Sequence, residues 1–208
     1  MIGTIIISVV IAFILGIIVP TIILTKTADK SSGITVTDIK KYEKQMRSKV
    51  YAPYAGRDVW DVALELNLDI IEIPDEDVDR ELGNKLSMLC PPNKQANKFT
   101  NGIIKYKSSP EKNFRIAHEI IHYLKDVGVG NKVSRLYGKD KKGAADKTDK
   151  EQIVDYMAAA LVMPFSNVAK DLQDEKTVKE LCEKYHQSEM LVSRRIDEVR
   201  FLQQLRGF

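Results

Sequence analysis

The chain has few cysteines and little excess of positive charge. Two cysteines among 208 residues cannot form a disulfide framework, and such sparse use is typical of a reducing compartment. The 32 lysine and arginine residues nearly balance the 29 aspartate and glutamate residues, so net charge gives no reason to expect direct nucleic-acid binding. A content of 44% hydrophobic and 29% charged residues excludes a disordered or collagen-like chain.

Charged side chains are missing from the first 25 residues. Residues 2–24 form an apolar run interrupted only by Gly, Thr, Ser and Pro20. As a helix this run would be about 34 Å long, which suffices to cross the hydrocarbon core of a bilayer. A cleaved signal peptide is the alternative, but no basic residue precedes the run and no small-residue cleavage site follows it. We therefore expect residues 1–24 to be a transmembrane anchor.

Lysines gather on the C-terminal side of this run, beginning with Lys26 and Lys30. The positive-inside rule then places the rest of the chain in the cytoplasm, in agreement with the scarce cysteines. The sequence thus predicts a single-pass membrane protein with a cytoplasmic domain. Residues 25–36 are polar, include Ser-Ser-Gly, and are expected to be a linker, which leaves 37–208 as one domain.

Hydrophobic periodicity predicts an α+β fold for this domain, with a small sheet followed by a mainly helical C-terminal half. Thr37 is the expected N-cap of the first helix. The basic segment 127–147 is expected to be a loop, either a solvated one or a lid over a cleft. The expected helices are 37–50, 58–66, 110–125, 148–162, 166–173, 176–186 and 189–205, and the expected strands are 69–73, 85–89 and 102–107.

The motif His-Glu-x-x-His occupies residues 118–122 of the expected helix 110–125. Two histidines four residues apart lie on the same helix face, so His118 and His122 can bind one metal ion, for which zinc (Zn²⁺) is the expected choice. Glu119 follows the first histidine and is the candidate general base for a zinc-activated water. The alternatives are two surface histidines with a solvated glutamate, or a metal site without catalysis.

A catalytic zinc needs a third protein ligand and an open fourth position. Glu151 on the next expected helix is the best candidate, and Asp155 follows one turn later as the carboxylate that orients a ligand histidine. Glu151 could instead close a capping box with Thr148. His186, the third histidine, is better explained as an exposed residue at a helix end. Possible oxyanion stabilisers are Tyr106, Tyr123, Tyr137 and Tyr156.

Two blocks of this sequence resemble the ImmA/IrrE metallopeptidase family. Residues 113–124 are similar to its HExxH block, and residues 151–164 are similar to its second block, in register from Glu151 to Pro164. The resemblance extends over residues 40–200 and implies a zincin-like domain with His118, His122 and Glu151 as zinc ligands and Glu119 as general base. Asp155 stands where the family usually has asparagine.

The same resemblance implies a zinc-dependent endopeptidase whose protein substrate is a regulator such as a helix-turn-helix repressor. The alternative function is a non-catalytic zinc-containing sensor or binding module of a regulatory system. An intramembrane protease is excluded because HExxH lies among charged residues, far from the apolar run. The last helix is expected to pack rather than to bind DNA, and the oligomeric state is not predicted.

Overall fold

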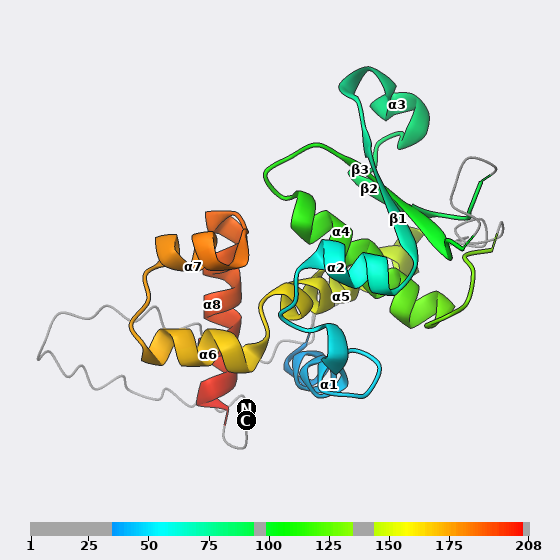
Figure 1. Ribbon diagram of the computed structural model, residues 1–208. Helices are drawn as coiled ribbons and strands as arrows, with labels where there is room; N and C mark the ends of the chain where they lie inside the picture. The colour runs from blue at the N-terminus through cyan, green and yellow to red at the C-terminus, as the bar shows by residue number, and fades with distance from the viewer. Residues whose placement is uncertain (1–34, 94–98, 135–143, 206–208) are drawn as a thin grey trace, which may run out of the picture. The chain divides into compact units, whose positions relative to one another are not determined.

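The computed structural model describes residues 35–93, 99–134 and 144–205 (Figure 1). The expected anchor, residues 1–24, lies outside these ranges, as does nearly all of the expected linker. None of the helices within the described ranges is long and apolar enough to cross a membrane. The described part is a mixed α+β fold with a three-stranded sheet and a helical majority, which confirms the expected fold class for this part of the chain.

The sheet consists of β1 (Leu68–Ile73), β2 (Ser87–Cys90) and β3 (Gly102–Lys107), in the order β1-β3-β2. β1 runs parallel to the central strand β3, whereas β2 pairs with it in the antiparallel direction. All three strands were expected from the sequence, although β2 begins two residues later than predicted. β2 therefore forms one edge of the sheet in the described chain.

One face of the sheet packs against α4 (Lys112–His122), which contacts both β2 and β3. α2 (Val59–Glu65) packs against β1 and α4, and α5 (Ala144–Val162) lies along α4 (Figure 1). Ile104 of the central strand and Ile116 and Ile120 of α4 are completely buried in this core. The helix that carries HExxH is therefore held between a sheet and a second helix.

Capping side chains set the beginnings of two N-terminal helices. Asp58 accepts hydrogen bonds from the backbone N–H groups of Trp60 and Asp61 at the start of α2. α1 (Val36–Met46) begins after Thr35, whose side chain forms a capping box with Asp38. The prediction of Thr37 as the N-cap was wrong, because the helix begins two residues earlier. Thr35, unlike Thr37, is followed three residues later by an acidic residue, Asp38, that can complete the capping box.

The segments around the HExxH helix differ from the prediction at two points. α4 continues into a π-helical turn, η3 (Tyr123–Val127), which ends at Gly128 with φ of 90°. α5 begins at Ala144 rather than at 148, so Thr148 lies within the helix and not at its start. The helix start that the capping-box alternative for Glu151 assumed is therefore wrong. Residues 135–143 of the expected basic loop lie outside the described ranges.

The remaining elements match the expected helical half. α6 (Phe165–Gln173), α7 (Val178–Tyr185) and α8 (Glu189–Gln204) follow α5. His186 ends α7 in the left-handed conformation, as expected for a residue at a helix end. Short elements that the sequence analysis did not anticipate are η1 (Ala52–Tyr54), η2 (Asp75–Asp77) and α3 (Val78–Glu81).

A buried ionic network joins α1, α5 and α8. The Arg195 guanidinium donates to Glu43 Oε1 at 2.5 Å and to the Met163 carbonyl oxygen at 2.9 Å. The Tyr156 hydroxyl donates to the same Glu43 oxygen at 2.7 Å. Glu198 adds a second carboxylate 3.1 Å from Arg195. Each charge thus has a partner, which a charge held away from water requires.

We expect Arg195→Ala to lower the free energy of unfolding by about 3–5 kcal/mol, because it leaves the buried Glu43 without its counter-charge. The matched control is Arg194→Ala, which removes a neighbouring, exposed arginine that pairs with Glu198 and should cost less than about 1 kcal/mol. Urea unfolding of the full chain measures both. Equal losses for the two variants would contradict the assigned role of the network.

A second polar cluster joins α6 to α7. The buried Asp171 carboxylate accepts hydrogen bonds from Lys176 and Lys184 at 2.7 Å and from the Tyr185 hydroxyl at 2.6 Å. Burial raises the pKa of Asp171, but these hydrogen bonds outweigh burial and lower the pKa to about 2. The folded protein therefore favours the ionised form of Asp171 more strongly than the unfolded chain does.

Because this pKa is lowered on folding, Asp171 stabilises the protein fully above its ordinary pKa of 3.8 and loses this contribution as the pH falls toward 2. We expect Asp171→Asn to be less stable at neutral pH and to lose stability less steeply than the wild type from about pH 4 to 2. Asp174→Asn, at an exposed position of the same helix end, should keep the wild-type profile. Unfolding curves across this pH range provide the measurement.

Candidate metal centre

The two motif histidines lie one turn apart on α4, and both are buried. The helix is amphipathic, so its apolar side chains pack into the core while the histidines turn toward α5. Their Nε2 atoms lie 3.2 Å apart, so the two ring nitrogens face a common position. The predicted pairing of His118 with His122 is therefore present in the structure.

Glu151 extends from α5 to the same position. Its Oε2 atom lies 3.2 Å from His118 Nε2 and 3.3 Å from His122 Nε2. Tetrahedral bonds of about 2.0–2.1 Å place ligand atoms about 3.3–3.4 Å apart. The three separations thus fit a zinc ion, with a fourth direction left for another ligand. Within the described residues, this is the only group of three such side chains that could hold a metal ion.

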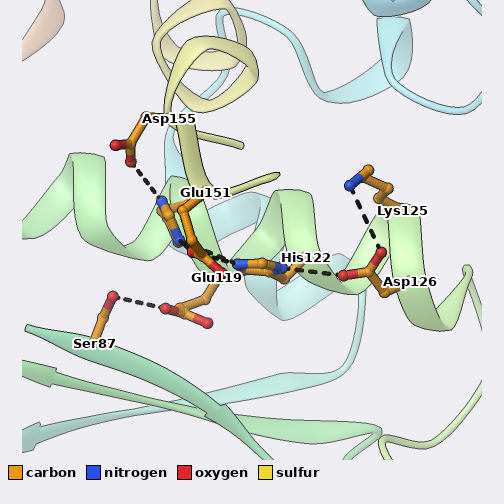
Figure 2. A network of polar contacts seen from close by, with 8 residues as sticks. Ser87, Glu119, His122, Lys125, Asp126, Glu151 and Asp155 are labelled. Atoms are coloured by element: carbon orange, nitrogen blue, oxygen red, sulfur yellow. Dashed lines mark hydrogen bonds and ion pairs between the residues drawn. The ribbon is translucent and has the colours of Figure 1, made fainter. Parts of the chain in front are cut away.

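A carboxylate lies behind each histidine. Asp155 Oδ1 is 2.8 Å from His118 Nδ1, and Asp126 Oδ2 is 3.1 Å from His122 Nδ1 (Figure 2). A carboxylate at Nδ1 favours a proton on that nitrogen, which leaves the Nε2 lone pair for a metal. Two nitrogen atoms and a carboxylate oxygen then converge, and a cation bound among them would stabilise this arrangement.

The charges around the histidines favour positive charge at this position. Burial alone lowers the pKa of His118, but the hydrogen bonds to Asp155 and Glu151 outweigh burial and raise the pKa to about 9. The pKa of His122 is also raised: burial lowers it, and the contacts with Asp126 and Glu151 overcome that effect. The same carboxylates would stabilise a divalent cation.

Glu119 does not join this group. Its carboxylate turns toward the sheet, where Ser87 donates a hydrogen bond to Oε1 at 2.7 Å (Figure 2). Glu119 is only 5% exposed and directly follows His118 in the chain. Glu119 is therefore next to a candidate ligand in the chain but is not one of the three side chains that converge.

Sequence reasoning missed two residues of this site. Asp126 could have been found, because it lies four positions after His122 on a continuing helix, the same spacing that relates the two histidines. Ser87 had no local signal, since it comes from a strand 32 residues before Glu119. The expected second carboxylate, Asp155, does lie beside His118 as predicted.

The other sequence candidates do not join the centre. The hydroxyls of Tyr106, Tyr123 and Tyr156 donate to Glu72, the Asn131 carbonyl and Glu43, respectively. Tyr137 lies outside the described residues. His186 lines a different cavity of about 240 Å³, between the start of α2 and the end of α7. An oxyanion-stabilising tyrosine is thus not assigned among the described residues.

We expect Asp126→Ala to weaken zinc binding by about 10–100-fold, because no acceptor then remains at Nδ1 to fix the tautomer and orientation of His122. Asp155→Ala should act similarly through His118. Asp197→Ala, an exposed change on α8, is the matched control and should bind zinc like the wild type. Competition with a chromogenic chelator measures the affinities, and unchanged affinity in the first two variants would contradict these orienting roles.

Comparison with protein families places these residues in a known context. Residues 102–197 match the model of the IrrE N-terminal-like domain, a peptidase family. The matched segment includes α4 and α5, and with them both histidines, Glu119 and Glu151. Comparison with curated proteins gives no match. The resemblance at the two sequence blocks is confirmed: the chain carries a domain of the ImmA/IrrE peptidase family over residues 102–197.

Proposed function

We propose that this protein is a membrane-anchored, zinc-dependent endopeptidase that cleaves a regulatory protein in the cytoplasm. The observation that carries the proposal is the triangle formed by His118 Nε2, His122 Nε2 and Glu151 Oε2, with sides of 3.2–3.3 Å and Glu119 beside it. A structural zinc site takes four protein ligands, whereas a catalytic site takes three and keeps a position open. A three-ligand set favours catalysis.

Each side chain has a distinct role in this proposal. His118, His122 and Glu151 hold the zinc ion, which supplies Lewis acidity to a peptide carbonyl and to an attacking water. Asp155 and Asp126 keep the two histidines oriented with Nε2 toward the metal. Glu119 accepts a proton from the attacking water and then donates it to the leaving amine, so that the peptide bond is hydrolysed.

The substrate in this proposal is a protein such as a helix-turn-helix repressor. The resemblance to the ImmA/IrrE family supports this class, because characterised members cleave such regulators. The anchoring part of the proposal rests on the apolar run 2–24 and on the lysines that follow it. An anchored peptidase would restrict cleavage to regulators that come to the membrane.

We expect Glu119→Gln to reduce peptide cleavage by about 10²–10⁴-fold while leaving one zinc ion bound per chain, because the amide cannot accept the proton. The measurement is hydrolysis of a degenerate library of quenched fluorescent peptides by the full-length chain in detergent, with zinc content determined in parallel. Glu183→Gln, an exposed glutamate on α7, serves as the control. Equal cleavage by wild type and Glu119→Gln would remove Glu119 from the mechanism.

Capture by the same variant separates the peptidase from a non-catalytic zinc-containing sensor. In native membranes, Glu119→Gln retains a substrate that the wild-type protein converts to two fragments. A sensor would instead bind zinc and retain its partner intact in both forms. Identification of the retained protein and of its fragments therefore decides between the two functions.

A further inference from the structure

The candidate general base has one hydrogen-bond partner among the described side chains. Ser87 Oγ lies 2.7 Å from Glu119 Oε1, and no described residue forms a hydrogen bond with the other carboxylate oxygen, Oε2 (Figure 2). Glu119 is only 5% exposed and Ser87 is partly buried, so the contact is shielded from bulk water. The two carboxylate oxygens therefore have different surroundings, one held by the sheet and one left available.

The backbone of β2 fixes the position of Ser87. In the antiparallel ladder Ser87 is opposite Tyr106, whose side chain is buried and whose hydroxyl donates to Glu72. Just before the strand, the Leu86 carbonyl accepts a hydrogen bond from the Lys107 N–H at 2.9 Å. Ser87 thus belongs to a paired strand that packs against α4, and its hydroxyl is held at a set distance from that helix.

We propose that Ser87 is a positioning residue for the proposed hydrolysis: its hydroxyl holds Glu119 Oε1 so that Oε2 is the oxygen that accepts the proton. The inference rests on the proposed function and adds a residue to it. A glutamate side chain rotates about three bonds, and a hydrogen bond from a rigid strand removes much of that freedom before the reaction. Ser87 itself does not contact the three candidate ligands in the described structure.

This role has a kinetic signature. Ser87 acts on the base rather than on the bound peptide, so its loss should lower kcat and leave KM nearly unchanged. We expect Ser87→Ala to lower kcat by about 10-fold, at the lower end of the losses seen when a residue that orients a catalytic group is removed. Ser87→Thr keeps the hydroxyl and suits a strand, so it should restore most of the wild-type rate.

A spectroscopic experiment tests the contact without relying on activity. Infrared difference spectra are recorded on the zinc-free, full-length chain with carbon-13 glutamate, comparing wild type with Ser87→Ala. Loss of the hydroxyl should shift one carboxylate stretching band, and the shift should disappear when the same comparison is made in the Glu119→Gln background. Ser166→Ala, an exposed serine of α6, is the matched control and should give no such band.

The kinetic measurement uses the zinc-loaded, full-length chain and the quenched fluorescent peptide library. A Glu119-dependent infrared shift together with a fall in kcat, both reversed by Ser87→Thr, supports the proposal. An absent shift, or a kcat equal to that of the wild type in Ser87→Ala that still binds one zinc ion, overturns it. If the wild type binds no zinc or cleaves no peptide, the proposed function is contradicted, and the positioning role of Ser87 falls with it. The infrared shift would in that case show only that Ser87 and Glu119 are hydrogen-bonded.

Discussion

The convergence of three electron-pair donors on one position is the constraint on which this fold depends. His118 and His122 are brought together by helix geometry alone, but Glu151 comes from another helix and must approach to hydrogen-bonding distance of both. Their lone pairs repel one another and lose water when buried, so either a proton on an imidazole or a bound cation is needed to offset this cost. The close packing of α4 against α5 maintains the approach.

Different residues surround the candidate metal centre on its helix side and on its sheet side. On the helix side, Asp155 and Asp126 set the tautomers of the histidines, one from α5 and one from the π-helical turn that continues α4. On the sheet side, Ser87 contacts Glu119. The candidate metal ligands and the candidate general base are therefore supported by different elements.

Local spacing made much of this arrangement predictable. The histidine pair, the three strands and most helices follow from periodicities of a few residues. Glu151 followed from the need of a catalytic zinc for a third ligand, and the family resemblance implied the same residue. Thr35 could have been chosen over Thr37, because only Thr35 has an acidic residue at the third position of the helix. Contacts between distant segments, such as Ser87 with Glu119, leave no periodic trace in a single sequence. Such contacts can be identified only from the three-dimensional structure.

The two candidate ligand histidines depend on different helices for their orientation. α5 supplies Glu151 and Asp155, whereas His122 and Asp126 are neighbours on a continuous helical segment. Displacement of α5 alone would withdraw one candidate ligand oxygen and release the His118 ring, yet leave the His122 imidazole oriented by Asp126. Tyr156 next to Asp155 is tied to Glu43 of α1. This hydrogen bond and the direct packing of α1 against α5 therefore link the first helix to the helix that carries Glu151 and Asp155.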